Sequence, residues 1–381
     1  MFHVITGLMA LYVIWRLVWR LRWPASVKWA LGIVVLFSCE YHLVTRTYFG
    51  SMASPELPAA VLMVLGGAFG AVVLAACLLL ILDLVGAFAY LFSKPAGRAL
   101  LTRLAPRASI GIAALLLSAV GVWQAVRVPD IRNVEIELAQ LPAELDGFRL
   151  VQLTDLHASR LLQRPWMEAV VGKTNALAPD LTVITGDLLD GTVAARRNDV
   201  EPLRALRAKL GVYAIPGNHE YYAQYQQWLA HLNSLGLRLL LNEHVTITRG
   251  SASFVLAGIT DSVAARFNQP LPDVNKALTG VAPEATVVLL SHRPPGAESN
   301  ARAGADLQLS GHTHGGQVLG LHWLTQLAND GYVSGLYQVD GMQLYVSNGT
   351  GLWNGFPLRL GKPSEITLIT LRSAGNGSAN R

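Results

Sequence analysis

The pattern of hydrophobic and polar positions changes at about residue 127. Before that point the chain holds four apolar stretches, each long enough to cross a bilayer, which takes roughly 20 helical residues. Beyond it, short apolar runs rich in β-branched residues alternate with amphipathic segments. The pattern therefore predicts a membrane part followed by an α/β domain. The predicted spans are Phe2–Trp19, Trp29–Val44, Pro58–Leu82 and Ser109–Val126.

Charge is divided unequally between these two parts. The first 127 residues hold ten Lys and Arg against three acidic residues, a net charge of +7, whereas the remainder has a net charge of −2. The basic character thus belongs to the membrane part, and we expect no nucleic-acid partner. Basic residues cluster after the first and third spans, while the connector between the second and third spans has only Arg46. These clusters are Arg16, Arg20, Arg22 and Lys28, and Lys94, Arg98, Arg103 and Arg107.

The clusters predict the orientation, because positively charged loops stay in the cytoplasm. Both termini and the soluble domain should then lie outside, which in a bacterium means an inner (plasma) membrane protein whose soluble domain is periplasmic or extracellular. A cleaved signal peptide is an alternative for the first span. The basic residues follow that apolar run, however, and no small-residue cleavage site comes after it.

Polar and small residues within the spans leave two questions open. Glu40 and Asp83 are either functional groups or side chains that reach the membrane surfaces. Asp83 can reach one surface because the third span is predicted to end near Leu82. Gly66 and Gly70 form a small-xxx-small pair, which packs closely on a neighbouring helix or on a second copy of the chain. A homo-oligomer formed through the membrane helices is therefore one expectation.

The remainder of the chain begins with the residues Val128–Asp130, a short linker. Arg132–Ala139 then alternates apolar and polar residues, which is typical of an edge strand. Strands alternate with helices at first and crowd together between Leu237 and Ile259, so we expect two packed mixed β-sheets flanked by helices. The expected helices are Trp166–Leu177, Val200–Lys209 and Tyr222–Leu235. The expected domains are 1–127, 128–372 and a disordered tail, 373–381, rich in Gly, Ser and Asn.

Five short polar clusters each follow an apolar run of strand length, and together they hold five of the ten histidines. Ligand-binding groups of α/β sheets lie in loops at the carboxyl ends of strands, so five such loops can converge. The clusters are Asp155-Leu156-His157, Gly186-Asp187, Gly217-Asn218-His219-Glu220, Ser291-His292 and Gly311-His312-Thr313-His314. They follow Phe148–Thr154, Leu181–Thr185, Val212–Pro216, Thr286–Leu290 and Asp306–Ser310.

The clusters supply carboxylate, amide and imidazole groups but no thiolate, since Cys39 and Cys77 both lie in predicted spans. Two adjacent divalent ions need one group that touches both, and Asp187, alone after its glycine, is the natural bridge. Mixed nitrogen and oxygen ligation favours Mn²⁺, with Fe, Zn²⁺ or Co²⁺ as alternatives, over Ca²⁺ or Mg²⁺. The remaining ligands divide into Asp155, His157 and His314 for one ion, and Asn218, His292 and His312 for the other.

These motifs occur in a specific order: Asp-x-His, Gly-Asp-x-x-Asp over Gly186–Asp190, Gly-Asn-His-Glu, a lone Ser-His, and Gly-His-Thr-His-Gly-Gly-Gln. The order resembles the signature of the calcineurin-like metallophosphoesterases over about Asn133–Arg372. The segment Val346–Gly351 is similar to that of a bacterial branch which often carries amino-terminal membrane helices. The resemblance implies a four-layer α/β/β/α sandwich and the same ligand assignment.

The resemblance also implies that His219 is an unligated acid near the leaving group, alongside the catalytic role of Asp187. The role of His219 as an acid also follows physically, because His219 adjoins a metal-binding Asn218 and can donate a proton to bound substrate. Gly315 either lets phosphate approach the backbone or forms a plain turn. Arg293 either touches substrate or is a solvated charge.

Together these patterns predict a membrane-anchored, metal-dependent phosphoesterase in which metal-activated hydroxide attacks phosphorus directly. The substrate is expected to be lipid-linked or amphiphilic, because four spans exceed what tethering requires and the linker is short. The apolar stretch Val318–Leu324 is then either a buried strand or a surface for acyl or isoprenoid chains. The alternatives are hydrolysis of soluble nucleotides or cyclic phosphodiesters, and a non-catalytic membrane scaffold or sensor, against which the complete ligand set argues.

The predicted orientation can be tested with topology reporters. A reporter fused after Arg372 should be active only if it functions outside the cytoplasm, and one fused near Gly97 only if it functions inside. The opposite pattern of activity would turn the catalytic domain inward and make cytosolic nucleotides the leading substrates.

Overall fold

The structure, a computed structural model, describes residues 2–52 and 54–374, and most of the predicted tail lies outside these residues. The chain forms two compact units. The helical unit comprises Met1–Ala125 and Asn354–Leu360. The catalytic unit comprises Val126–Trp353 and Gly361–Arg381. A short segment near the carboxyl terminus therefore belongs with the amino-terminal helices, which the hydrophobic pattern does not indicate.

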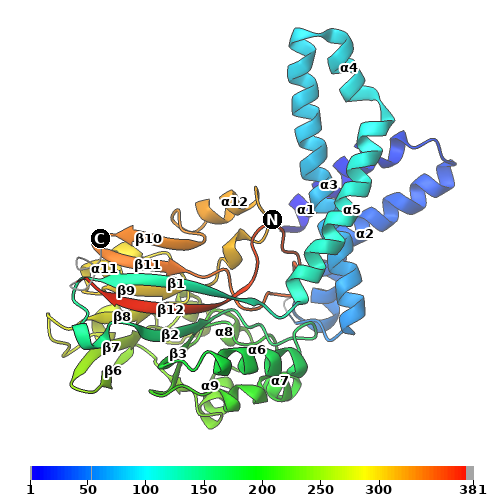
Figure 1. The fold of residues 1–381 in the computed structure, drawn as a ribbon. Coiled ribbons are helices and arrows are strands. Elements are labelled where there is room, and N and C mark those ends of the chain that lie inside the picture. Colours follow the sequence, from blue (N-terminus) through cyan, green and yellow to red (C-terminus); the bar gives the residue numbers. More distant parts are fainter. Residues whose placement is uncertain (1, 53, 375–381) are drawn as a thin grey trace. The chain divides into compact units, whose positions relative to one another are not determined.

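Four helices of the helical unit are long and apolar enough to cross a membrane, and they contain the four predicted spans except Pro58, which directly precedes the third helix. They are α1 (Phe2–Arg16, continued by the 3₁₀ turn Val18–Arg20), α2 (Ala25–Phe49), α3 (Ala59–Phe92) and α5 (Leu104–Val126), with the shorter α4 (Lys94–Thr102) between the last two. These elements are drawn in blue to cyan in Figure 1. The third helix continues ten residues past its predicted end, so Asp83 lies within the helix rather than at its end.

Acidic residues inside these helices are paired, as the cost of placing a charge in an apolar medium requires. Asp83 accepts a hydrogen bond from the hydroxyl of Tyr12 at 2.7 Å and forms an ion pair with Arg16. Glu40 accepts one from the hydroxyl of Thr6 at 2.8 Å, and His3 Nδ1 lies 2.9 Å from its other oxygen. Each pairing joins two different helices.

The segment Asn354–Leu360 packs against glycines of α3. A Cβ atom at Gly66 would overlap Pro357, and one at Gly70 would lie 3.2 Å from Leu358. Gly70 also faces a neighbouring helix, as one of the predicted alternatives has it, because its Cβ would lie 2.9 Å from Ser118 Oγ of α5, whereas Gly66 meets the 354–360 segment. The two glycines keep the helix surface flat enough for this segment to lie against it.

Backbone hydrogen bonds hold the same segment to the helices. The amide of Arg359 donates to the carbonyl of Gly121 in α5 at 3.0 Å, and His42 Nε2 lies 2.5 Å from the carbonyl oxygen of Gly355. An extended segment among apolar helices needs such partners, because unpaired peptide groups are costly away from water.

The catalytic unit contains two six-stranded mixed sheets, ordered β1-β12-β2-β3-β4-β5 and β10-β11-β9-β8-β7-β6. The strand β1 lies at an edge, as its alternation predicts. The first sheet consists of β1 (Asp130–Leu138), β12 (Glu365–Ser373), β2 (Phe148–Leu153), β3 (Leu181–Thr185), β4 (Val212–Ile215) and β5 (Arg238–Leu239). The second consists of β10 (Gly335–Val339), β11 (Met342–Val346), β9 (Leu307–Ser310), β8 (Val287–Leu290), β7 (Ala252–Gly258) and β6 (Glu243–Arg249).

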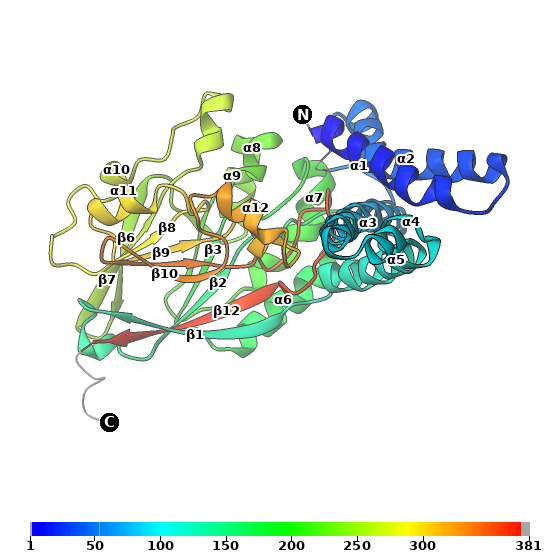
Figure 2. The same ribbon diagram turned by 90° about the horizontal axis from the view of Figure 1, so that it is seen from above.

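The two sheets share one buried core, to which Leu150 and Val183 of the first and Val288 and Leu309 of the second contribute. The outer faces are covered by helices, which confirms the predicted four-layer sandwich. The helices α6 (Arg164–Ala176), α7 (Val193–Val200) and α9 (Tyr225–Ser234) lie on one side of the first sheet (Figure 1). The short helices α10 (Val274–Ala277) and α11 (Ala297–Arg302) lie beside the second (Figure 2).

Two of the predicted helices differ from the observed ones. The prediction of a helix over Val200–Lys209 is wrong, because α7 ends at Val200 and a 3₁₀ turn, Glu201–Ala205, follows. Pro202 explains this end, since proline lacks the amide that a helix interior requires. The helix expected over Tyr222–Leu235 is interrupted at Gln224, whose φ of 58° separates α8 (His219–Tyr222) from α9.

The apolar stretch after the last histidine motif is not a buried strand. Gly320 adopts a φ of 97°, and the chain then forms the helix α12 (His322–Leu327). Trp323 and Leu324 on this helix are both exposed. The sequence pattern alone does not distinguish a short buried strand from a short surface helix of the same composition.

Candidate metal centre

The five polar clusters lie at the carboxyl ends of five strands, β2, β3 and β4 of the first sheet and β8 and β9 of the second. These strands run parallel within each sheet, so their following loops meet at one edge of the sandwich. Asp155, His157, Asp187 and His292 are almost completely buried there. The fold therefore brings together the side chains that the motifs single out.

The backbone of these loops adopts an uncommon conformation at five of the predicted ligands. Left-handed φ values at non-glycine residues cost on the order of 1–3 kcal/mol each and persist only where the surrounding structure imposes them. Such residues cluster at functional sites, and the five here surround one point. They are Asp155 (53°), His157 (45°), Asp187 (53°), His312 (67°) and His314 (51°).

One group of potential ligands contains Asp155, His157 and His314, whose ligand atoms all lie within 4.8 Å of one another. His314 Nε2 lies 3.6 Å from Asp155 Oδ1, and His157 Nε2 lies 3.9 Å from the same oxygen. The backbone amide of His312 donates to both oxygens of Asp155, at 3.1 and 3.0 Å, and thereby orients this carboxylate.

A second group contains Asp187, His292 and His312. His292 Nε2 lies 3.2 Å from Asp187 Oδ2 and 3.2 Å from the amide oxygen of Asn218. The other ring nitrogen of His292 lies 2.8 Å from the carbonyl oxygen of Thr185, to which it can only donate. This contact leaves Nε2 as the ring nitrogen that faces the two oxygens. Burial opposes protonation, but the Asp187 carboxylate raises the pKa of His292 to about 10.

Asp187 lies between the two groups. Its Oδ2 is 3.7 Å from His157 Nε2 and 3.2 Å from His292 Nε2, while its Oδ1 accepts a hydrogen bond from the amide of His219 at 2.8 Å. One carboxylate oxygen thus faces nitrogen atoms of both groups. A ligand shared by two cations would occupy such a position.

The donor set fits divalent cations. His157 Nδ1 lies 3.1 Å from Asp190, whereas its Nε2 is buried and has no hydrogen-bond partner among the described residues. Burial, together with His292 and Arg293, lowers the pKa of His312 well below its usual range, so this imidazole is neutral and has a lone pair to offer. Imidazole lone pairs beside carboxylate oxygens are typical of sites for transition-metal ions.

The two aspartates respond to burial in opposite directions. Burial, with the nearby Asp187 carboxylate, raises the pKa of Asp155. Burial also opposes ionisation of Asp187, but His292 and His219 hold the pKa of that carboxyl well below its usual range. Cations between the groups would favour the ionised form of both carboxylates, because an opposite charge within a few ångströms lowers a carboxyl pKa.

His219 belongs to a further group of potential ligands, with His157 and Asp187, whose ligand atoms all lie within 4.8 Å of one another, and a carboxylate also holds its ring. Its Nδ1 lies 2.5 Å from Asp190 Oδ1, and its Nε2 lies 4.0 Å from Asp187 Oδ2. Burial opposes protonation, but the carboxylates of Asp187 and Asp190 raise the pKa of His219 to about 9. Asp190 contacts both His157 and His219 and so sets the orientation of two rings at once.

A second buried carboxylate organises the backbone. Glu220 accepts hydrogen bonds from the amides of Gly217 at 2.6 Å, Leu188 at 2.7 Å and Asp187 at 3.1 Å. Burial and the Asp187 carboxylate raise the pKa of Glu220 to about 7. These bonds tie the loop after β3 to the loop after β4, and Glu220 acts through them as a support of the site.

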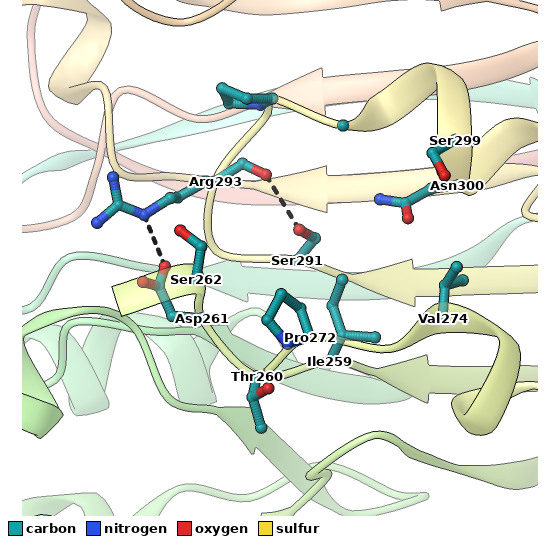
Figure 3. Close-up of a pocket in the computed structure, with 12 residues that line it drawn as sticks. Ile259, Thr260, Asp261, Ser262, Pro272, Val274, Ser291, Arg293, Ser299 and Asn300 are labelled. Carbon is teal, nitrogen blue, oxygen red and sulfur yellow. Dashed lines mark hydrogen bonds and ion pairs between the residues drawn. The ribbon is translucent and has the colours of Figure 1, made fainter. Parts of the chain in front are cut away.

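Arg293 connects the second group to an adjoining cavity of ≈380 Å³. Its Nη1 lies 2.9 Å from His312 Nε2, and its Nε donates to the buried Asp261 at 2.8 Å (Figure 3). Hydroxyl groups of Ser262 and Ser299 also line this cavity (Figure 3). The cavity is within the size range of small-molecule sites, about 300–1,000 Å³. The sequence did not indicate Asp261 or this cavity.

The glycines after His314 are required by protein contacts. A Cβ at Gly315, whose φ is 62°, would overlap the side chain of Asn348, and one at Gly316 would overlap His322 of α12. The motif loop therefore packs against the loop after β11 on one side and against α12 on the other.

Three further residues at the site carry no strong sequence signal. The hydroxyl of Tyr222 lies 3.1 Å from Asn218 Nδ2, which directs the amide oxygen of Asn218 towards His292. Asn348 contacts the motif loop, and the ring of Trp353 lies 6.5 Å from that of His219. Of the three, only Asn348 lies in the Ser-Asn-Gly-Thr-Gly segment after Val346, which could have pointed to it.

Comparison with known proteins gives concordant matches. The family model of calcineurin-like phosphoesterases matches residues 148–316. A transmembrane protein with a metallophosphoesterase domain from Bos taurus is 36% identical over 323 residues, which cover 80% of this chain and 72% of that protein. An uncharacterized metallophosphoesterase from Helicobacter pylori is 36% identical over 253 residues, covering 66% of each chain. A solved phosphopantetheinyl hydrolase from Mycobacterium tuberculosis has a TM-score of 0.35 at 14% identity and covers 54% of this chain and 91% of that one.

The position of Asp187 between the groups generates a prediction about metal content. Asp187→Asn should abolish hydrolysis and lower the bound metal by more than one ion per chain, because a shared carboxylate serves both ions. Metal content of the purified full-length protein, measured by mass spectrometry, checks this. Asp180→Asn is the matched control, since Asp180 is a buried aspartate paired with Lys209 outside these groups. Two ions retained in Asp187→Asn would remove Asp187 from the bridging role.

Proposed function

Because this chain belongs to the calcineurin-like metallophosphoesterase family, we propose that it hydrolyses phosphate ester or diphosphate bonds by direct attack of hydroxide, without a covalent enzyme intermediate. The family and the domain identify the chain as a metal-dependent phosphoester hydrolase with four membrane-type helices. The observation that carries the proposal is the convergence of two ligand groups on Asp187. No cysteine or serine nucleophile is needed in this scheme.

Two divalent ions held by these residues, with Mn²⁺ favoured, would supply hydroxide at neutral pH and neutralise the phosphate oxygens. The proposed ligands are Asp155, His157 and His314 for one ion, Asn218, His292 and His312 for the other, and Asp187 for both. Hydrogen bonds from backbone amides to the carboxylates of Asp155 and Glu220 hold these side chains in place, so substrate binding needs little rearrangement.

His219 is proposed to protonate the leaving oxygen. An imidazole with a raised pKa carries its proton at neutral pH, and Asp190 on Nδ1 leaves Nε2 as the nitrogen that can deliver it. Asn218 and Arg293 are proposed to bind the phosphate, Asn218 through its amide and Arg293 through the guanidinium beside His312. Gly315 is proposed to contribute its backbone, although its lack of a Cβ is already required by Asn348.

The substrate is proposed to be lipid-linked or otherwise amphiphilic. The last membrane-type helix ends at Val126 and the first strand begins at Asp130, so only three residues separate them. A domain tethered this closely works at the surface of the bilayer, where amphiphilic phosphates are concentrated. On the charge asymmetry of the helix-connecting loops, we place this surface outside the cytoplasm, in the periplasm or at the cell exterior of a bacterium.

The acid role of His219 predicts a loss that depends on the leaving group. His219→Ala should keep its metal ions and lower the rate by roughly 10²–10⁴ on alkyl phosphoesters, the usual range for a general acid. The loss should shrink for nitrophenyl esters, whose leaving group needs no proton. Steady-state rates on the two substrate types measure this, with His244→Ala on β6 as the control. An equal loss on both types would assign His219 to binding instead.

The amphiphilic substrate predicts a dependence on chain length. In proteoliposomes, a long-chain phosphoester should be hydrolysed with a higher kcat/KM than its short-chain analogue, because only the long-chain form partitions into the membrane that holds the enzyme. Equal efficiency for both chain lengths, in liposomes and in detergent, would leave the helices as an anchor only. Preferential hydrolysis of soluble nucleotides in the same assay would favour the nucleotide alternative.

A further inference from the structure

Four large apolar side chains of the catalytic unit are exposed within nine residues of the chain. The exposed fractions are 66% for Leu319, 64% for Trp323, 66% for Leu324 and 81% for Leu327. Among the other exposed large apolar residues described in this unit, the highest value is 55%, for Leu271. We call the four residues the α12 patch. A contiguous apolar patch on a domain surface marks an interaction site.

The composition around the patch suits an apolar medium. Residues 307–329 contain no Asp, Glu, Lys or Arg, so no ionised side chain of this segment would lose its hydration on entering lipid. Indole rings favour the boundary between lipid and water, where the ring is apolar and its N–H can still find a partner. The exposed fractions resemble those on membrane-type α3, where Leu84 has 62%, Phe88 63% and Leu91 77%.

The chain connects the patch to residues that pack among the membrane-type helices. Val318 forms an antiparallel bridge with Gly361, and Leu319 Cβ lies 3.1 Å from the position of a Cβ at Gly361. Gly361 directly follows Leu360, the last residue of the segment that belongs to the helical unit. Val318, next to Leu319 of the α12 patch, therefore pairs with the residue that directly follows this segment in the chain.

We propose that the α12 patch inserts into the lipid bilayer at its surface, with the hydrocarbon boundary as its partner. This inference deepens the proposed function, since it rests on a membrane-linked substrate. Gly316 packs against His322 of α12 and lies two residues after His314. Insertion of α12 therefore fixes the loop that carries two proposed metal ligands at the depth of the lipid headgroups, and an amphiphilic phosphate reaches the metal centre without leaving the membrane.

Site-directed fluorescence tests insertion independently of hydrolysis. In full-length protein carrying Cys39→Ala and Cys77→Ala, a single cysteine is introduced as Leu327→Cys or, for comparison, as Ser251→Cys in the exposed turn between β6 and β7. Each is labelled with an environment-sensitive fluorophore and reconstituted in phosphatidylethanolamine and phosphatidylglycerol vesicles. We expect the label at 327 to shift to the blue, to be quenched by nitroxide-bearing lipids and to be shielded from iodide, and the label at 251 to show the reverse.

Two results would overturn the inference. Iodide quenching at 327 equal to that at 251 would mean that the patch stays in water. Shielding from iodide without quenching by lipid nitroxide, increasing with the protein-to-lipid ratio, would mean that a second copy of the chain covers the patch. Because neither measurement depends on turnover, a protein that inserts but hydrolyses no tested ester would count against the proposed function alone.

A functional comparison separates lipid contact from folding. Leu319→Gln combined with Leu324→Gln and Leu327→Gln should keep the metal content and the rate on nitrophenyl phosphate, because none of the three side chains belongs to the metal centre. Hydrolysis of a long-chain phosphoester in vesicles should fall. If vesicle hydrolysis and lipid quenching at a label on Thr325→Cys both stay unchanged in the triple variant, the α12 patch has no role at the membrane.

Discussion

Two buried carboxylates, those of Asp155 and Asp187, impose the constraint around which the catalytic unit is organised. Carboxylates removed from water must be compensated by positive charge or by hydrogen-bond donors, and both kinds of group surround them here. Backbone amides of His312 and His219 donate to them, and imidazoles face their remaining oxygens. The left-handed backbone at five of the proposed ligands is the conformational cost of this arrangement. This left-handed conformation occurs at the ends of strands from both sheets. The packing of the two sheets therefore imposes it on the loops that follow.

Two further buried carboxylates, those of Asp190 and Glu220, support this centre through hydrogen bonds. Asp190 orients the rings of His157 and His219 through one oxygen, and Glu220 joins two loops through three amides. Neither residue has to bind an ion itself, because its hydrogen bonds position the side chains that are proposed to do so. Arg293 extends the network to Asp261 and to a cavity beside the second ligand group.

In the helical unit, too, polar groups that lie among apolar side chains are paired. Glu40 and Asp83, both half-buried, are paired across helices, and the polar backbone of the 354–360 segment is hydrogen-bonded among α2 and α5. Small residues at Gly66 and Gly70 allow this segment to approach the helix closely. The same loop begins at Asn348, which packs on the glycine after His314, so one continuous stretch of chain runs from the proposed metal centre to the membrane-type helices.

The sequence by itself determined the elements whose signal is local. It contained the four apolar helices, the strands before each polar cluster and the residues of the proposed metal centre, because hydrophobic period and motif chemistry are written along the chain. It did not contain the break at Gln224, the surface position of α12 or the return of residues 354–360 to the helices. These features, like the roles of Asp261 and Trp353, depend on contacts between residues far apart in sequence. Only the tertiary structure decided them, because a short segment takes the conformation that its neighbours in space stabilise.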